Sequence, residues 1–206
     1  MSVRPIRFAF DEEKFVQALA FLAEKRLPQL TTLKVAKLLF LADKKHFTTY
    51  GRPILGDQYV GMKNGPCPSR ALNLMNLAVK GEGARPIGAP VPPAKGLIDE
   101  FLKVDRSQGK NPVFVAHRKP DLSVFSRSEL KILDEVIAEH GKKTGRKLVD
   151  ETHEDRAYAI AWGRRGSAVS AEMPYELFFE GASAGVMRVK KLVEVEQEDR
   201  DFVPAR

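Results

Sequence analysis

The chain has 206 residues, of which 43% are hydrophobic, and it carries a net charge of +7 with a pI near 9.5. This composition is enough for one sizeable core in one compact domain. No apolar run approaches the roughly 20 residues that span a bilayer, and the first residues lead into the charged run 11–13 instead of a signal-peptide core. We therefore expect no membrane partner.

A single cysteine, Cys67, excludes an intrachain disulfide and is typical of a reducing compartment. Free cysteines are most often small buried hydrophobes, so we do not interpret Cys67 as a nucleophile. The expected location is the cytoplasm.

The first half of the chain predicts two helices, a short strand and a third helix. Residues 10–26 carry apolar residues at helical spacing, with Asp11 as the N-cap candidate. A second, almost wholly apolar helix begins at Thr31 or Thr32 and ends near Phe47. The short connection predicts that these two helices form an antiparallel hairpin. Residues 57–62 then indicate a strand that leads into a turn at 63–66, and residues 68–80 indicate the third helix.

The second half predicts further helices and one hairpin. Glycine and proline fill residues 81–96, which we interpret as a loop, and a helix follows near residues 97–104. The hairpin is expected to pair residues 113–115 with residues 122–125. A capping box then opens a helix that ends near His140, two more helices are expected near residues 144–153 and 157–162, and the chain from Arg188 is expected to be loosely held. The predicted fold is mainly α, a compact helical bundle with a small antiparallel β patch.

The sequence offers little catalytic or cofactor chemistry. Its four histidines lack metal-ligand spacing, and neither a P-loop nor a dinucleotide fingerprint is present. We therefore expect no metal, no cofactor and no catalytic residue. Asp43 and Asp57 stand out because a carboxylate in an apolar segment needs a partner. They either tie the turn after the second helix to that helix or recognise a partner, and Arg52 and Lys63 are the nearby candidates to pair with them.

The basic residues are spread along the chain, with one tight cluster at Lys142, Lys143, Arg146 and Lys147. A phosphate-binding role for this cluster competes with a solvated helix start and with an acidic protein partner.

Residues 37–69 carry four unlike motifs in a fixed order: a Lys-Leu-aromatic-Leu-Ala-Asp helix, then Tyr-Gly-Arg-Pro-Ile, Gly-Asp-x-Tyr and Gly-Pro-x-Pro. This order resembles the signature of the Panacea domain, the SocA-like antitoxin family that also occurs in phage-associated proteins. The departures are Gly61, Cys67 and the insert 81–96. The residues of this signature that we expect to be structural are Lys37, Asp43, Gly51, Pro53, Gly56, Asp57, Gly65 and Pro66. The resemblance extends to a domain over residues 10–180, between an arm at 1–9 and a tail at 181–206.

The resemblance implies an antitoxin, not an enzyme, that neutralises the toxin encoded beside it by direct protein–protein binding. In the SocA-like branch it implies an adaptor that delivers the toxin to a ClpXP-type protease. Aromatic residues and arginines dominate the energy of such interfaces, so the candidate contact residues are Tyr50, Arg52, Tyr59, Lys63 and Trp162. The alternative is a nucleic-acid-binding regulator with a basic surface.

Overall fold

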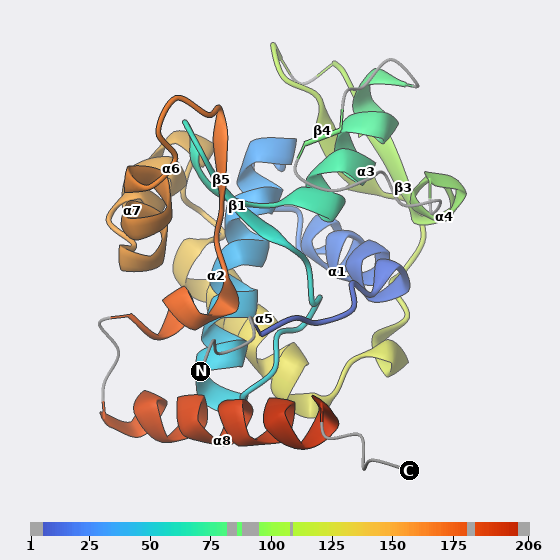
Figure 1. The fold of residues 1–206 in the computed structure, drawn as a ribbon. Helices are drawn as coiled ribbons and strands as arrows, with labels where there is room; N and C mark the ends of the chain where they lie inside the picture. The colour runs from blue at the N-terminus through green and yellow to red at the C-terminus, as the bar shows by residue number, and fades with distance from the viewer. Residues whose placement is uncertain (1–5, 82–85, 88–94, 108, 181–183, 202–206) are drawn as a thin grey trace.

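Helix α2 (Thr32–Tyr50) runs through the centre of the molecule, and helices from both halves of the chain pack around it (Figure 1). The computed structural model describes residues 6–81, 86–87, 95–107, 109–180 and 184–201. The Thr31 side chain caps the start of α2 by accepting a hydrogen bond from the Lys34 N–H. At the other end Gly51 adopts the left-handed conformation (φ +78°) that ends the helix, as the sequence predicted, although α2 runs three residues beyond Phe47.

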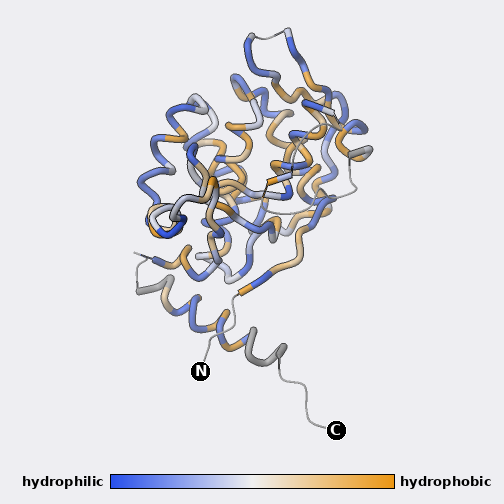
Figure 2. The backbone as a smooth tube through the Cα atoms, turned by 45° about the horizontal axis from the view of Figure 1, so that its top comes forward, coloured by the Kyte–Doolittle hydropathy of each residue, from blue (hydrophilic) through white to orange (hydrophobic). Residues whose placement is uncertain are grey.

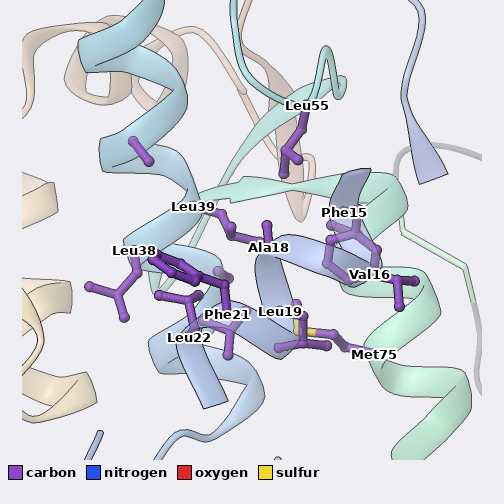
Figure 3. Close-up of a cluster of buried hydrophobic side chains, with 14 of the residues drawn as sticks. Phe15, Val16, Ala18, Leu19, Phe21, Leu22, Leu38, Leu39, Leu55 and Met75 are labelled. Atoms are coloured by element: carbon purple, nitrogen blue, oxygen red, sulfur yellow. The ribbon is translucent and has the colours of Figure 1, made fainter. Parts of the chain in front are cut away.

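Helix α1 (Glu12–Glu24) provides much of the main hydrophobic core. It begins at the predicted N-cap, Asp11, and every residue from 15 to 23 is buried. Figure 3 shows Leu39 of α2 directed toward Ala18 of α1, and both belong to one cluster of buried side chains with Leu19, Leu22 and Leu38. The expected antiparallel hairpin is wrong, because α1 is inclined to α2 and makes most of its contacts with strand β4 (Val113–Ala116) and helix α4 (Lys95–Phe101) (Figure 1).

A three-stranded antiparallel sheet in the order β2-β1-β5 covers one side of α2. Its strands are β1 (Tyr59–Met62), β2 (Gly65–Pro68) and β5 (Ser170–Glu172). The β1 strand was predicted, but residues 65–66 belong to β2 and not to a turn, so the turn is only Lys63-Asn64. Two prolines are tolerated in β2 because it is the edge strand.

The second sheet corrects two predictions. Helix α4 (Lys95–Phe101) ends early, and residues 102–105 form strand β3, which pairs antiparallel with β4 (Val113–Ala116). The expected second strand at 122–125 is instead the 3-10 helix η1 (Leu122–Val124), because the Asp121 side chain accepts the Ser123 N–H and closes a local turn. The hairpin lies against α1.

The remaining helices of the domain begin where the sequence places them, and α5, α6 and α7 each have a local side-chain cap at their start. The capping box of α5, formed by Ser126 and Glu129, is present as predicted. These helices are α3 (Ser69–Lys80), α5 (Arg127–His140), α6 (Gly145–His153) and α7 (Arg156–Gly163). Most of the predicted loop at 81–96 lies outside the described residues. Ile87 is described, and its backbone forms two hydrogen bonds with the Asn73 side chain.

A second hydrophobic cluster, rich in aromatic rings, lies beside the C-terminal half of α2. Phe40 and Phe47 of α2 meet Tyr59 of β1 and Phe178 of the 3-10 helix η2 (Tyr175–Phe179). Residues 184–201 form helix α8 (Ala184–Asp201), where the sequence indicated a loosely held end. Helix α8 packs on α2 and η2 (Figure 1). None of the helices described is both long and apolar enough to cross a membrane.

Candidate partner-binding site

Asp43 joins α2 to the segment that follows it. Its Oδ1 accepts hydrogen bonds from the Ile54 N–H (2.9 Å) and the Leu55 N–H (3.0 Å), and its Oδ2 accepts one from the Tyr59 hydroxyl (3.0 Å). Burial raises the pKa of Asp43 to about 7, although these hydrogen bonds oppose the rise. Asp43 therefore ties the turn to the helix, which is one of the two expected roles. Its partners are not Arg52 or Lys63.

Asp57 holds the start of helix α3. Its two carboxylate oxygens accept the Arg70 N–H (3.1 Å) and the Ala71 N–H (2.8 Å), which helical hydrogen bonds leave unpaired. Burial raises the pKa of Asp57 to about 6. The Tyr175 hydroxyl donates to the Asp57 carbonyl (2.8 Å), so this residue also connects the sheet to η2.

Lys37 and Gly65 join α2 to the edge strand. The Lys37 ammonium is buried and donates to the Pro66 carbonyl at 2.6 Å, and burial lowers the pKa of Lys37 to about 8. Gly65 has φ +90°, and a Cβ there would lie 2.9 Å from Lys37 Nζ. Burial raises the pKa of the neighbouring Cys67 thiol to about 12, which keeps it protonated near neutral pH.

These contacts show that the signature residues form an internal frame. Pro53 and Gly56 are likewise buried in the segment between α2 and β1. Tyr59, which we expected to contact a partner, is only 1% exposed and lies in the aromatic cluster. In this position Tyr59 supports the frame and offers no surface to another protein.

A ladder of stacked side chains connects α6, α7 and the loop after α7. The His153 and Tyr158 rings stack at 4.8 Å, the Tyr158 and Trp162 rings at 6.0 Å, and the Arg165 guanidinium lies 3.8 Å from the centre of the Trp162 ring. The Tyr158 hydroxyl donates to the Met62 carbonyl (3.0 Å) and so fixes the ladder to the tip of the β1–β2 hairpin. The half-buried Trp162 is thereby held in one orientation.

This ladder brings two of the predicted contact residues to one surface. Lys63 follows Met62 in the exposed turn, and Met62 pairs with Ser170 of β5, so Val169 lies beside the same turn. Val169 is 84% exposed, the highest value among the large hydrophobic residues described as exposed. We call Lys63, Trp162, Arg165 and Val169 the Trp162 face.

Tyr50 and Arg52 lie elsewhere, at the C-terminal end of α2. The Tyr50 ring is exposed and packs on His46 with ring centroids 4.9 Å apart. The Arg52 side chain is also exposed, while its carbonyl is 2.6 Å from His46 Nδ1. The structure therefore divides the four candidates other than the buried Tyr59 between two surfaces.

The basic cluster at the start of α6 is partly neutralised. Lys143 Nζ lies 2.9 Å from a Glu151 carboxylate oxygen, and Arg146 Nε lies 3.2 Å from Asp150 Oδ1. Only Lys142 and Lys147 of the four show no ion pair among the described residues. This pairing weakens the case for a phosphate-binding patch.

A cavity of about 390 Å³ lies between α2, α3 and the β1–β2 hairpin. Its described lining includes Ala36, Lys37, Met62 and Cys67, and it contains neither a carboxylate nor an imidazole. Within the described part of the chain, no three His, Cys, Asp or Glu side chains are grouped as metal ligands.

Tyr158, Arg165 and Val169 are not among the predicted contact residues. The spacing of Tyr158, Trp162 and Arg165 (i, i+4, i+7) places them on one face of a helix, and that pattern could have identified the ladder. Nothing in the sequence indicates that residue 169 lies beside residue 63, because strand β5 creates that proximity.

The mainly helical fold and its frame of buried polar contacts define a rigid scaffold. The chain belongs to the SocA-like antitoxin family: residues 35–158 match the family described as antitoxin SocA-like, Panacea domain. This membership supports an antitoxin role and implies a toxin as partner. Neither the curated proteins nor the solved structures gave a match.

Proposed function

We propose that this protein neutralises the toxin encoded beside it by binding that toxin directly through the Trp162 face. The family match carries the antitoxin role. The choice of surface rests on the stacked ladder, because Trp and Arg residues in fixed orientations dominate the energy of protein interfaces.

The chemistry of the Trp162 face suits a protein partner. The exposed Val169 adds apolar area, while Lys63 and Arg165 supply positive charge at the rim. Because the Trp162 ring is already held between Tyr158 and Arg165, little side-chain entropy is lost on binding.

The first experiment expresses the product of the adjacent reading frame alone and together with this protein. We expect growth arrest without the antitoxin, restored growth with it, and co-purification of the two proteins. Absence of both rescue and a complex would contradict the proposed function.

A pair of matched double variants then tests the surface. Trp162→Ala with Arg165→Ala should weaken toxin binding by at least about 2 kcal/mol, which is roughly 30-fold in the dissociation constant. Tyr50→Ala with Arg52→Ala likewise removes one aromatic ring and one guanidinium, at the C-terminal end of α2, and should leave the affinity within about threefold of wild type. The reverse result would move the interface to the C-terminal end of α2.

Delivery of the toxin to a ClpXP-type protease is the second part of the proposal, and the resemblance to the SocA-like branch supports it. In cells that contain the protease, co-expression should shorten the half-life of the toxin. In protease-deficient cells the toxin should persist, and growth rescue should fail if neutralisation depends on degradation. If the half-life of the toxin is unchanged and growth is fully restored, the protein neutralises the toxin by binding alone and not by delivering it to the protease.

A further inference from the structure

The outward side of α8 carries exposed apolar residues. Leu192 is 64% exposed, Val195 48% and Met187 46%, and together they are three of the seven large hydrophobic residues described as exposed. Figure 2 shows the helix nearest the C-terminus, α8, at the edge of the molecule with hydrophobic and hydrophilic positions alternating along it.

The inward side of α8 is already used. Val193 is buried and Val189 half-buried, and a Cβ at position 51 would lie 3.0 Å from Val193 Cγ2. The helix is therefore held against the end of α2 by one side. In the described part of the chain, nothing covers Leu192 or Val195 on the other side.

The charges of α8 are divided along its length. Arg188, Lys190 and Lys191 lie in the first half, whereas the second half is predominantly acidic. The acidic residues are Glu194, Glu196, Glu198, Asp199 and Asp201. Two such helices in antiparallel orientation place the basic half of one opposite the acidic half of the other, whereas a parallel pair would align like charges.

We propose that α8 pairs antiparallel with α8 of a second copy of this chain and forms a symmetric homodimer. The second copy fits because its helix presents the same apolar residues and the complementary charge order, as a twofold interface requires. Helix α8 lies outside the family match at 35–158, so this proposal does not rest on the antitoxin role. Figure 1 shows α8 at the opposite end of α2 from the β1–β2 turn.

The length of α8 limits the area that the proposed dimer can bury, and therefore its affinity. The 18 residues of α8 span about 27 Å at ~1.5 Å per residue. A single helix pair buries less than the ~800 Å² per partner of a standard interface, so we expect a dissociation constant on the order of 10 µM.

Sedimentation velocity on the full chain tests the dimer. The mass should rise from 23.0 kDa towards twice that value as the concentration passes through the micromolar range. A mass that stays at 23.0 kDa up to about 100 µM, tenfold above the expected constant, would overturn the proposal.

Charge exchange tests the antiparallel geometry. Arg188→Glu with Lys191→Glu makes α8 mainly acidic, because only Lys190 and Arg200 remain basic, and Glu196→Lys with Glu198→Lys makes it mainly basic. Each variant alone should be monomeric, and an equimolar mixture should form a heterodimer. Dimers that persist in both separate variants would show that another surface is used.

Lys142→Glu with Lys147→Glu is the matched control, because it makes the same change of charge in α6 and the turn before it, and it should dimerise like wild type. Circular dichroism should show unchanged helix content in all variants, since the substituted residues Arg188, Lys191 and Glu196 are exposed.

Discussion

Single buried polar residues connect the central helix and the segments around it. Lys37 donates to Pro66, Asp43 accepts from Leu55, and Asp57 accepts from Ala71, so each of these side chains joins elements that are separate in the sequence. A buried polar group is costly unless it is paired, and its loss leaves its partners unpaired as well. The order of these residues in the signature therefore reflects the three-dimensional frame.

Asp43 should make stability depend on pH. Its folded pKa, about 7, is raised above the ordinary 3.8, so the folded state binds more protons between these values and stability falls as the pH rises through this range. In Asp43→Asn this contribution is absent. We expect the free energy of unfolding, measured with urea, to fall more in wild type than in the variant as the pH rises from about 4 to about 7. If the free energies of unfolding of the two proteins change with pH in the same way, the raised pKa of Asp43 would be contradicted.

Gly65 should tolerate no side chain. Its φ of +90° disfavours other residues, and an added Cβ would lie 2.9 Å from Lys37 Nζ and 3.0 Å from Thr152 Oγ1. Gly65→Ala should therefore lower the free energy of unfolding by about 1–3 kcal/mol.

Gly163→Ala is the control for this substitution, because no atom lies within 4 Å of the added Cβ. It should leave stability unchanged or raise it by up to about 1 kcal/mol, since alanine favours the helix. Equal losses for the two variants in chemical denaturation would argue against a special constraint at position 65.

Several helix starts are determined by residues next to them in the sequence. The caps Asp11, Thr144 and Ser126 lie beside the residues they satisfy, so the sequence was sufficient to predict these helix starts. Residues 102–105 become a strand only because β4 lies beside them, and periodicity over a short window could not distinguish that outcome from a helix.

In the candidate site, too, the sequence predicted the local features and not those that depend on tertiary contacts. The role of Asp43 in tying a turn to α2 followed from a carboxylate in an apolar helix, but its Tyr59 partner depends on the position of the sheet. Trp162 was proposed as a contact residue from its residue type, and this stays a prediction, whereas the burial of Tyr59 among aromatic rings from α2 and η2 is a tertiary effect. Aromatic type alone does not distinguish a core residue from an interface residue.

Helix α7 is the element on which the proposed interface depends. Asp155 caps its start by accepting the Ala157 and Tyr158 N–H groups and also pairs with Lys44 of α2. Asp155→Ala should lower stability by about 1 kcal/mol and weaken toxin binding, because Trp162 loses its fixed position.

Asp11→Ala removes the cap of α1 and is the matched control for α7. It should destabilise the protein by a similar amount, about 1 kcal/mol, and leave toxin affinity at the wild-type value in calorimetric titrations. Equal losses of affinity in the two variants would mean that binding follows global stability and not the position of α7.

At the scale of the whole molecule, the frame around α2 separates two exposed regions. The Trp162 face lies by the tip of the β1–β2 hairpin, and α8 lies at the C-terminal end of α2 (Figure 1). One chain could therefore hold a toxin at one region and a second copy of itself at the other. This arrangement predicts that toxin binding and dimerisation are independent.

Hydrogen exchange of the free and toxin-bound protein, followed by mass spectrometry, tests the central claim most directly. Toxin binding should slow exchange in peptides that cover residues 60–66 and 160–172, because these carry the Trp162 face. Peptides of α8 should exchange at the same rate in both states. Slowed exchange confined to other segments, with residues 60–66 and 160–172 unchanged, would contradict the account.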